Sequence, residues 1–198
     1  MKVTAPPSES VTVTAVFTNL VAPVRIAIGL EKWNVGLDVI KDLQFTTPTG
    51  EPLTYKQVDR RTVEVAGSPR TVVARYAQDL QRAQYRGNKV ESVGGKLTGY
   101  ESLLVPEGQP LSAAKIRLDL PNSWKVVSTY PQEGPWSVIR PYSFGDLALE
   151  VSVGGWYFGA IDFDQTKTYP DGFSVRVVGF KGMRYGYRAW DLYSFRGA

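Results

Sequence analysis

The sequence of 198 residues contains neither cysteine nor histidine. Without cysteine, disulfide bonds are excluded, and the redox compartment cannot be inferred from cysteine usage. Without histidine, a Ser-His-Asp triad and a Cys-His pair are excluded, as are an HExxH zinc helix and a thiolate zinc site. We therefore expect no catalytic residue, metal ligand or cofactor in this chain.

The sequence also lacks long apolar runs. No run approaches the roughly 20 residues that span a bilayer, and residues 1–7 have no apolar core of a secretory signal. We expect neither a membrane span nor a signal peptide, and the localisation stays open. The length and the hydrophobic fraction of 43% suit one globular domain spanning residues 1–198.

Acidic and glycine-rich motifs give little evidence of chemistry. Asp162 and Asp164 would share one face of a strand. That spacing is compatible with a glycosidase-type carboxylate pair, but a solvated edge or turn is the favoured interpretation. The pairs Gly94-Gly95 and Gly154-Gly155 interrupt strand-like segments, so we expect bulges or hairpin turns there.

The net charge of +4 is unevenly spread along the chain. Residues 56–89 hold eight basic side chains against three acids, and residues 176–196 hold five against one. Nucleic-acid binding is one interpretation, but no nucleic-acid motif accompanies the charge and we consider this partner unlikely. Arginines coating the solvent face of strands, or a surface that meets an acidic partner domain, explain the charge equally well.

Period-two alternation dominates the hydrophobic pattern. It is clearest at residues 11–17, 25–30, 61–65, 71–76, 115–120 and 156–163, and turn residues separate these runs. The pattern predicts an all-β fold with little helix: a two-layer antiparallel sandwich or a saddle-like pair of curved sheets. Residues 75–84 have helical spacing, but a β-branched run leads into them, so we expect a strand through Tyr76 and beyond.

Several segments, taken in order, resemble the N-terminal domain of the glycyl aminopeptidase family of thermolysin-like zinc metallopeptidases. "AIGLEKWNVGLDVIKDLQF" has an apolar strand, a Trp-x-x-Gly turn and an aspartate, here Trp33, Gly36 and Asp42. "TPTGEPLTYKQVDRRTVEV" resembles the family's glycine-containing hairpin, "VVARYAQDL" its central strand, and "AAKIRLDLPNSWKVVSTYP" a strand followed by Leu-Pro, a turn and Trp. The family's Asp-Ser-Pro segment is not found.

The resemblance implies that the chain is the non-catalytic N-terminal fragment of a larger peptidase. Zinc and its ligands would then lie in a downstream catalytic domain of the same polypeptide. The β domain would support that domain and line the entrance for a peptide substrate. The alternative is a free-standing β-sandwich module that binds carbohydrate or protein through exposed aromatics.

The aromatic residues divide into two predicted groups. We expect Trp33 and Trp124 to be structural, with Trp124 filling the space between two sheet layers rather than forming a ligand platform. Trp136, Trp156 and Tyr157 lie near Gly and Pro, where we expect exposure and a domain or ligand contact. Residues 181–196 have the composition of a contact surface, with an ordinary last strand as the alternative. The candidate contact residues in that segment are Met183, Tyr185, Tyr187, Trp190 and Tyr193.

Overall fold

The computed structural model describes residues 10–28, 35–79, 89–91, 94–99, 103–109, 112–120, 123–140, 154–180 and 194–196. Within these ranges nearly all regular structure is β-strand, apart from a 3-10 turn at Leu37–Val39, and the paired strands run antiparallel. The predicted all-β antiparallel fold is confirmed.

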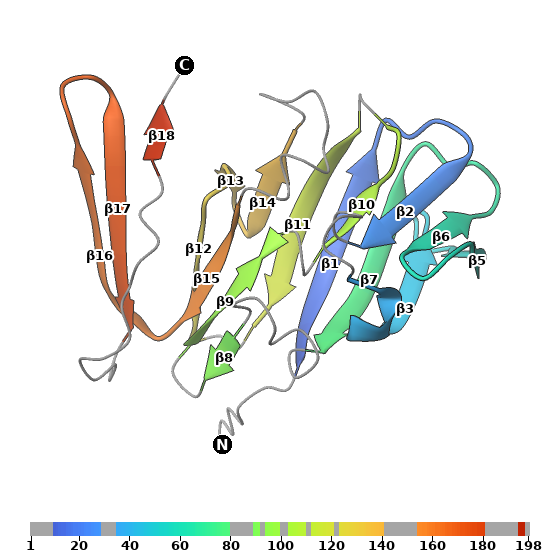
Figure 1. The fold of residues 1–198 in the computed structure, drawn as a ribbon, viewed down its shortest axis with the longest axis horizontal. Coiled ribbons are helices and arrows are strands. Elements are labelled where there is room, and N and C mark those ends of the chain that lie inside the picture. The colour runs from blue at the N-terminus through green and yellow to red at the C-terminus, as the bar shows by residue number, and fades with distance from the viewer. Residues whose placement is uncertain are drawn as a thin grey trace.

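A seven-stranded sheet forms one layer (Figure 1). Its strands, in spatial order, are β13 (Gln132–Glu133), β14 (Trp136–Ile139), β11 (Ala113–Asp119), β1 (Ser10–Thr18), β7 (Val72–Asp79), β3 (Ile40–Thr46) and β4 (Pro52–Leu53). The central strand β1 pairs with β11 on one side and with β7 on the other.

The other described strands form three smaller sheets. The first contains β10 (Leu104–Pro106), β2 (Val24–Ile28), β6 (Thr62–Val65) and β5 (Tyr55–Gln57). The second contains β12 (Lys125–Ser128), β15 (Gly155–Gly159), β9 (Gly94–Thr98) and β8 (Lys89–Glu91). The third contains β16 (Ile161–Thr168), β17 (Phe173–Phe180) and β18 (Ser194–Arg196), and its hairpin stands at the left of Figure 1.

Alternation along β1 explains why the large sheet has one core-facing side. Val13, Ala15 and Phe17 are fully buried, whereas Thr12 and Val16 on the opposite face are only half-buried. Because successive strand residues point to opposite faces, the first set lines an inner face. A single core cluster joins these residues to Ile26 and Ile28 of β2 and to Trp156 and Phe158 of β15. Both four-stranded sheets therefore pack on the same face of the large sheet, which gives the fold two layers.

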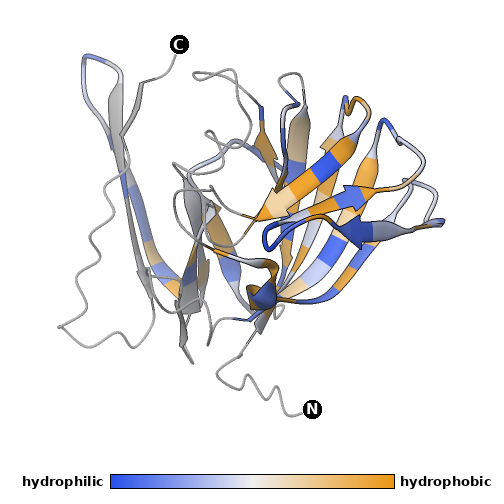
Figure 2. Ribbon diagram, turned by 45° about the vertical axis from the view of Figure 1, so that its right-hand side comes forward, coloured by the Kyte–Doolittle hydropathy of each residue, from blue (hydrophilic) through white to orange (hydrophobic). Residues whose placement is uncertain are grey.

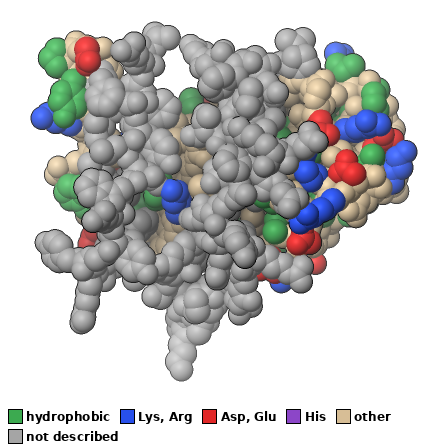
Figure 3. Space-filling model, in the orientation of Figure 1, with side chains coloured by type: hydrophobic (Ala, Val, Ile, Leu, Met, Phe, Trp, Pro, Cys, Tyr) green, Lys and Arg blue, Asp and Glu red, His purple; other side chains and the backbone are tan. Residues whose placement is uncertain are grey.

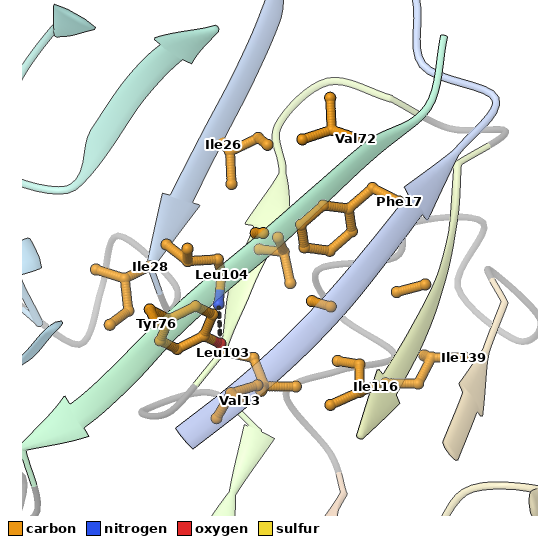
Figure 4. Close-up of a cluster of buried hydrophobic side chains, with 14 of the residues drawn as sticks. Val13, Phe17, Ile26, Ile28, Val72, Tyr76, Leu103, Leu104, Ile116 and Ile139 are labelled. Carbon is orange, nitrogen blue, oxygen red and sulfur yellow. Dashed lines mark hydrogen bonds between the residues drawn. The ribbon is translucent and has the colours of Figure 1, made fainter. Parts of the chain in front are cut away.

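Tyr76 connects the large sheet to the first four-stranded sheet. Its side chain is 1% exposed, and its hydroxyl oxygen accepts a hydrogen bond of 3.2 Å from the backbone N–H of Leu104 in β10 (Figure 4). Burial raises the pKa of the Tyr76 phenol well above its ordinary value of 10.0. The continuation of β7 through Asp79 confirms the prediction of a strand rather than a helix in this segment.

Trp156 connects the large sheet to the second four-stranded sheet. Its ring is fully buried, and its indole N–H donates a hydrogen bond of 2.7 Å to the hydroxyl of Ser137 in β14. Tyr130 packs against the Trp156 ring with centroids 4.9 Å apart. Trp124 is partly buried and stacks on Phe158, the next inward residue of β15, with centroids 5.9 Å apart.

The glycine pairs lie mainly in regular strands, so the predicted bulges or hairpin turns are wrong for three of the four residues. Gly94 and Gly95 pair in register with Gly159 and Phe158. Gly155 begins β15, where an added Cβ would collide with the carbonyl oxygen of Leu97. The glycine is needed there because a neighbouring backbone passes too close for any side chain.

The hairpin formed by β16 and β17 departs from the inward and outward alternation of the sandwich. The chain turns from β15 into β16 through Gly159, whose φ is 152°, and the register shifts between Ile161 and Phe163. Beyond Ile161 every residue of β16 is exposed. Figure 2 shows this strand coloured mostly hydrophilic, in contrast to the alternating bands of the sandwich.

Replacing Tyr76 by Phe should destabilise the fold by about 1–3 kcal/mol at neutral pH, because the buried N–H of Leu104 loses its acceptor. The variant should also weaken the loss of stability at alkaline pH. Above pH 10.0 the unfolded phenol releases its proton while the buried one keeps it, so unfolding becomes more favourable as the pH rises. Urea unfolding from pH 7 to 11 measures both effects. Exposed Tyr169→Phe is the control, and equal behaviour of the two variants would contradict the prediction.

Replacing Trp156 by Ala should lower the free energy of unfolding by about 3–5 kcal/mol, because a fully buried ring leaves a cavity. Ser137→Ala should cost about 1–3 kcal/mol, because the buried indole N–H loses its acceptor. Trp124→Ala should cost less than Trp156→Ala, because the Trp124 ring is only partly buried. Guanidinium unfolding of the three variants provides the measurement. A Trp156→Ala value below that of Trp124→Ala would contradict this order.

Candidate functional site

Metal-binding side chains do not gather in the part of the chain that the structure describes. Those residues contain no group of three or more His, Cys, Asp or Glu that could hold a metal ion. No described helix is long and apolar enough to cross a membrane. Candidate functional features must therefore be sought among surface charges and aromatic side chains.

The outer face of the seven-stranded sheet carries charged side chains that pair with one another. The Arg117 guanidinium lies 5.0 Å from the centre of the Trp136 ring and also contacts Asp119 at 3.0 Å. Next to this pair, the Lys115 ammonium lies 2.6 Å from Glu133, and this contact lowers the pKa of the Glu133 carboxyl. Trp136 is half-buried and has a cation over its ring, so it is not an open aromatic platform.

A second charged surface lies over β2, β6 and β5. The Glu64 carboxylate contacts Lys56 at 2.8 Å and Arg25 at 3.2 Å, and these cations lower the pKa of the Glu64 carboxyl. Arg61, mostly buried, contacts Glu107 at 3.1 Å. Figure 3 shows basic and acidic side chains intermixed at this end of the molecule. Two basic residues of segment 56–89 are thus paired with acids, which does not favour a nucleic-acid surface.

The predicted contact residues Trp136, Trp156 and Tyr157 do not form one exposed patch. The expectation that Trp156 is exposed is wrong, because its ring lies in the core between β15 and β14. Strand alternation places Tyr157 on the opposite face of β15, where it is half-buried and the Lys96 ammonium lies 5.6 Å from its ring centre. The glycines before Trp156 suggested an exposed segment. In the structure, Gly155 instead allows the backbone of the neighbouring strand to pass close by.

The remaining predicted aromatics are placed only in part. Trp124 is partly buried and packs against the core cluster. Six predicted residues lie outside the described part of the chain: Trp33, Met183, Tyr185, Tyr187, Trp190 and Tyr193.

Asp162 and Asp164 lie on the exposed strand β16. Asp164 makes a two-pronged ion pair with Arg176 of β17, at 2.7 Å to the guanidinium Nε and 2.6 Å to Nη2. This pairing lowers the pKa of the Asp164 carboxyl, whereas a catalytic acid of a glycosidase needs a raised one. The favoured interpretation, a solvated strand, agrees with the exposure of both residues.

Sequence reasoning missed a group of exposed apolar side chains at and near the hairpin. Phe163 is 43% exposed and Tyr169 is 40% exposed, whereas Val126, which is 38% exposed, lies on β12 of another sheet. Figure 3 shows hydrophobic side chains at the hairpin tip, at the upper left. One signal was available: from Asp162 to Thr168 the sequence has a single apolar residue, which is unusual for a strand that packs on a core.

Replacing Asp164 by Asn should destabilise the chain by no more than about 1 kcal/mol at neutral pH, because the ion pair is partly exposed. The depressed pKa means that this stabilisation is present above the ordinary Asp value of 3.8 and is lost as the pH falls through the lower folded value. The difference between wild type and variant should therefore vanish in strong acid. Urea unfolding and an NMR titration of the carboxyl measure this. An Asp164 pKa at or above 3.8 would contradict it.

Comparisons with known proteins bear on the fold and the family. The chain is similar to a solved aminopeptidase N family protein from Idiomarina loihiensis, with a TM-score of 0.65 and 17% sequence identity. The match covers 86% of this chain but only 30% of that protein, and at this identity it shows the fold alone. No curated protein sequence matches significantly. The family model of the peptidase M61 N-terminal domain matches residues 37–147, more than half of the chain. The chain therefore belongs to the family of peptidase M61 N-terminal domains.

Proposed function

We propose that this chain is the non-catalytic N-terminal β domain of a zinc aminopeptidase, of the glycyl aminopeptidase type that the sequence resembles. In this role it supports a catalytic domain that follows it in the same polypeptide and lines the entrance for the amino terminus of a peptide substrate. The match of residues 37–147 to the peptidase M61 N-terminal domain carries the proposal.

The residues of this chain do not fit a zinc site. Histidine and cysteine are absent from the whole sequence, and the described residues contain no cluster of carboxylates that could replace them. The proposal therefore assigns zinc and the chemistry of peptide hydrolysis to the following domain. In this proposal the chain has a structural role: it is a two-layer β domain whose sheets are joined by hydrogen bonds of Tyr76 and Trp156.

The size of the structural neighbour supports a role within a larger protein. The chain spans about a third of the aminopeptidase N family protein that it matches. A free-standing binding module is not favoured, because Trp156 lies in the core and Trp136 lies under Arg117. These were two of the three aromatics on which the module interpretation depended.

The full-length polypeptide that contains this chain should bind one zinc ion and release amino-terminal residues from glycyl and alanyl test substrates. Atomic absorption after dialysis and chromogenic aminoacyl anilides measure the two properties, and a chelator should abolish turnover reversibly. Residues 1–198 alone should show neither property, because the chain has no histidine or cysteine. Stoichiometric zinc or turnover in the short chain, or a full-length polypeptide inactive toward all such substrates, would contradict the proposal.

A further inference from the structure

Strand β16 is an edge strand of unusual length for this fold. Each described sheet ends in two edge strands, and the others besides β16 are β13, β4, β10, β5, β12, β8 and β18. Those strands contain two to four residues each, whereas β16 contains eight. Natural β proteins keep exposed edges short, because unpaired backbone N–H and C=O groups recruit other strands. The length of β16 is therefore an exception within this fold.

The outer edge of β16 is open in the part of the chain that the structure describes. β17 pairs with one side of β16, and no described strand pairs with the other. Residues 162–167 are all exposed, and no described turn or loop forms a backbone hydrogen bond with them. Figure 1 shows β16 on the outer side of the hairpin. The strand therefore presents backbone donors and acceptors with which another extended backbone can pair.

The charged side chains of β16 do not block this edge. Charges on an edge strand usually repel an added strand. Here Asp164 is held by its two-pronged ion pair with Arg176 of β17, and the Lys167 ammonium lies 4.9 Å from the centre of the Tyr169 ring. Both charges thus have partners within the hairpin. β16 also contains no proline, which would remove a backbone donor.

Asp162 differs from the other charged residues of β16. It falls at the register shift between Ile161 and Phe163, where it is the extra residue of a β-bulge. Its exposed carboxylate makes no ion pair with a described cation. A cation on an added strand would be attracted to this carboxylate, whereas an acidic side chain would be repelled. The edge therefore favours a strand that carries lysine or arginine.

Phe163 provides an apolar contact next to this carboxylate. Its side chain lies over Gly179 of β17, where an added Cβ would come within 3.2 Å of the Phe163 Cβ. The side chain nevertheless keeps 43% of its surface exposed. A side chain of an added strand on this face would pack beside the ring. Backbone pairing together with a few side-chain contacts is how a sheet edge recognises an extended peptide.

We propose that the outer edge of β16 binds an extended segment of another polypeptide, which joins the sheet as a fourth, antiparallel strand and places a lysine or arginine at Asp162. Antiparallel pairing is the more stable arrangement per residue. Because Asp162 lies at the start of β16, the basic residue then lies near the carboxyl end of the bound segment. This inference goes beyond the proposed function and does not depend on it.

A second copy of this chain is a less suitable partner for the edge. Seven exposed strand residues span about 23 Å, and a sheet is about 10 Å thick, so edge-to-edge pairing covers only about 230 Å² on each partner. A specific dimer buries about 800 Å² on each partner. The cation that Asp162 favours is also lacking, because the single lysine of β16, Lys167, already lies over the Tyr169 ring.

Binding of a short peptide to this chain provides the first test. The probe is acetyl-Thr-Val-Thr-Val-Thr-Lys-amide, and NMR of the backbone amides follows its binding. Chemical-shift changes should be confined to β16 and β17, and replacing the lysine of the probe by glutamate should weaken binding about three- to tenfold. A probe methylated on every backbone nitrogen should not bind, because it has no donors for the edge. Binding of the methylated probe, or no binding of the unmethylated one, would overturn the inference.

Replacing Asp162 by Asn tests the position of the cation. This variant should bind the lysine and glutamate probes equally well, because the carboxylate that distinguishes them is gone. Glu51→Gln is the matched control, since Glu51 is also an exposed acid and lies in the loop before β4. The control should keep the three- to tenfold preference for the lysine probe. An unchanged preference in Asp162→Asn would overturn the inference.

Proline substitutions at Gln165 and Thr166 test the edge itself. Neighbouring residues of β16 direct their backbone N–H alternately toward β17 and away from it, so one proline breaks the ladder and the other changes only the outer edge. The variant that keeps the thermal midpoint of the wild type should bind the lysine probe at least about tenfold more weakly. Full binding by that variant would contradict the proposal. The methylated probe decides the same point without any change in the protein.

The remaining outcomes identify other occupants and separate this inference from the proposed function. Slow hydrogen exchange of the outer amides in the monomer without the probe would show that this chain covers the edge itself. A dimer in light scattering with protected β16 amides would identify a second copy as the occupant. Either result would overturn the inference. Peptide binding at β16 in a full-length polypeptide without zinc or turnover would contradict the proposed function alone, and turnover without such binding would contradict the inference alone.

Discussion

The packing of one inner sheet face against two smaller sheets is the constraint on which the rest of the structure depends. Each smaller sheet is held by apolar contacts and by one buried polar side chain whose partner belongs to the other layer: Tyr76 with Leu104, and Trp156 with Ser137. A buried phenol or indole without a partner is costly, so these hydrogen bonds select the relative position of the layers. The apolar contacts supply most of the stabilisation, and the polar ones fix the arrangement.

The fold class followed from the sequence because strand alternation is a local property. Val13, Ala15 and Phe17 alternate with polar or half-buried neighbours, and any two-layer β fold would bury such a set. Residues 75–84 have helical spacing, but the β-branched residues that lead into Tyr76 favoured a strand. In the structure Tyr76 lies in a strand and pairs opposite Val13. Non-local pairing overrides local helix propensity there.

The surface could be predicted far less well, because exposure depends on which segments meet in space. Trp156 next to two glycines suggested an exposed ring, yet Gly155 is there because the Leu97 carbonyl passes close, which brings the tryptophan into the core. Phe163 was assigned to an ordinary strand, since only the structure shows that β16 turns away from the sandwich at Gly159. Both errors have one origin: sequence spacing gives the face of a strand but not what covers that face.

The large sheet and the hairpin differ in how their charged side chains are paired. Charges on the outer face of the large sheet pair across neighbouring strands, as with Lys115 and Glu133, and such a face gains little from further burial. The hairpin instead uses its ion pair, Asp164 with Arg176, on one face and leaves Phe163 on the other. This ion pair joins the two strands of the hairpin, while Phe163 keeps 43% of its surface exposed. The described surface therefore contains two kinds of region: a sheet face whose charges pair across neighbouring strands, and a hairpin strand with an exposed aromatic side chain.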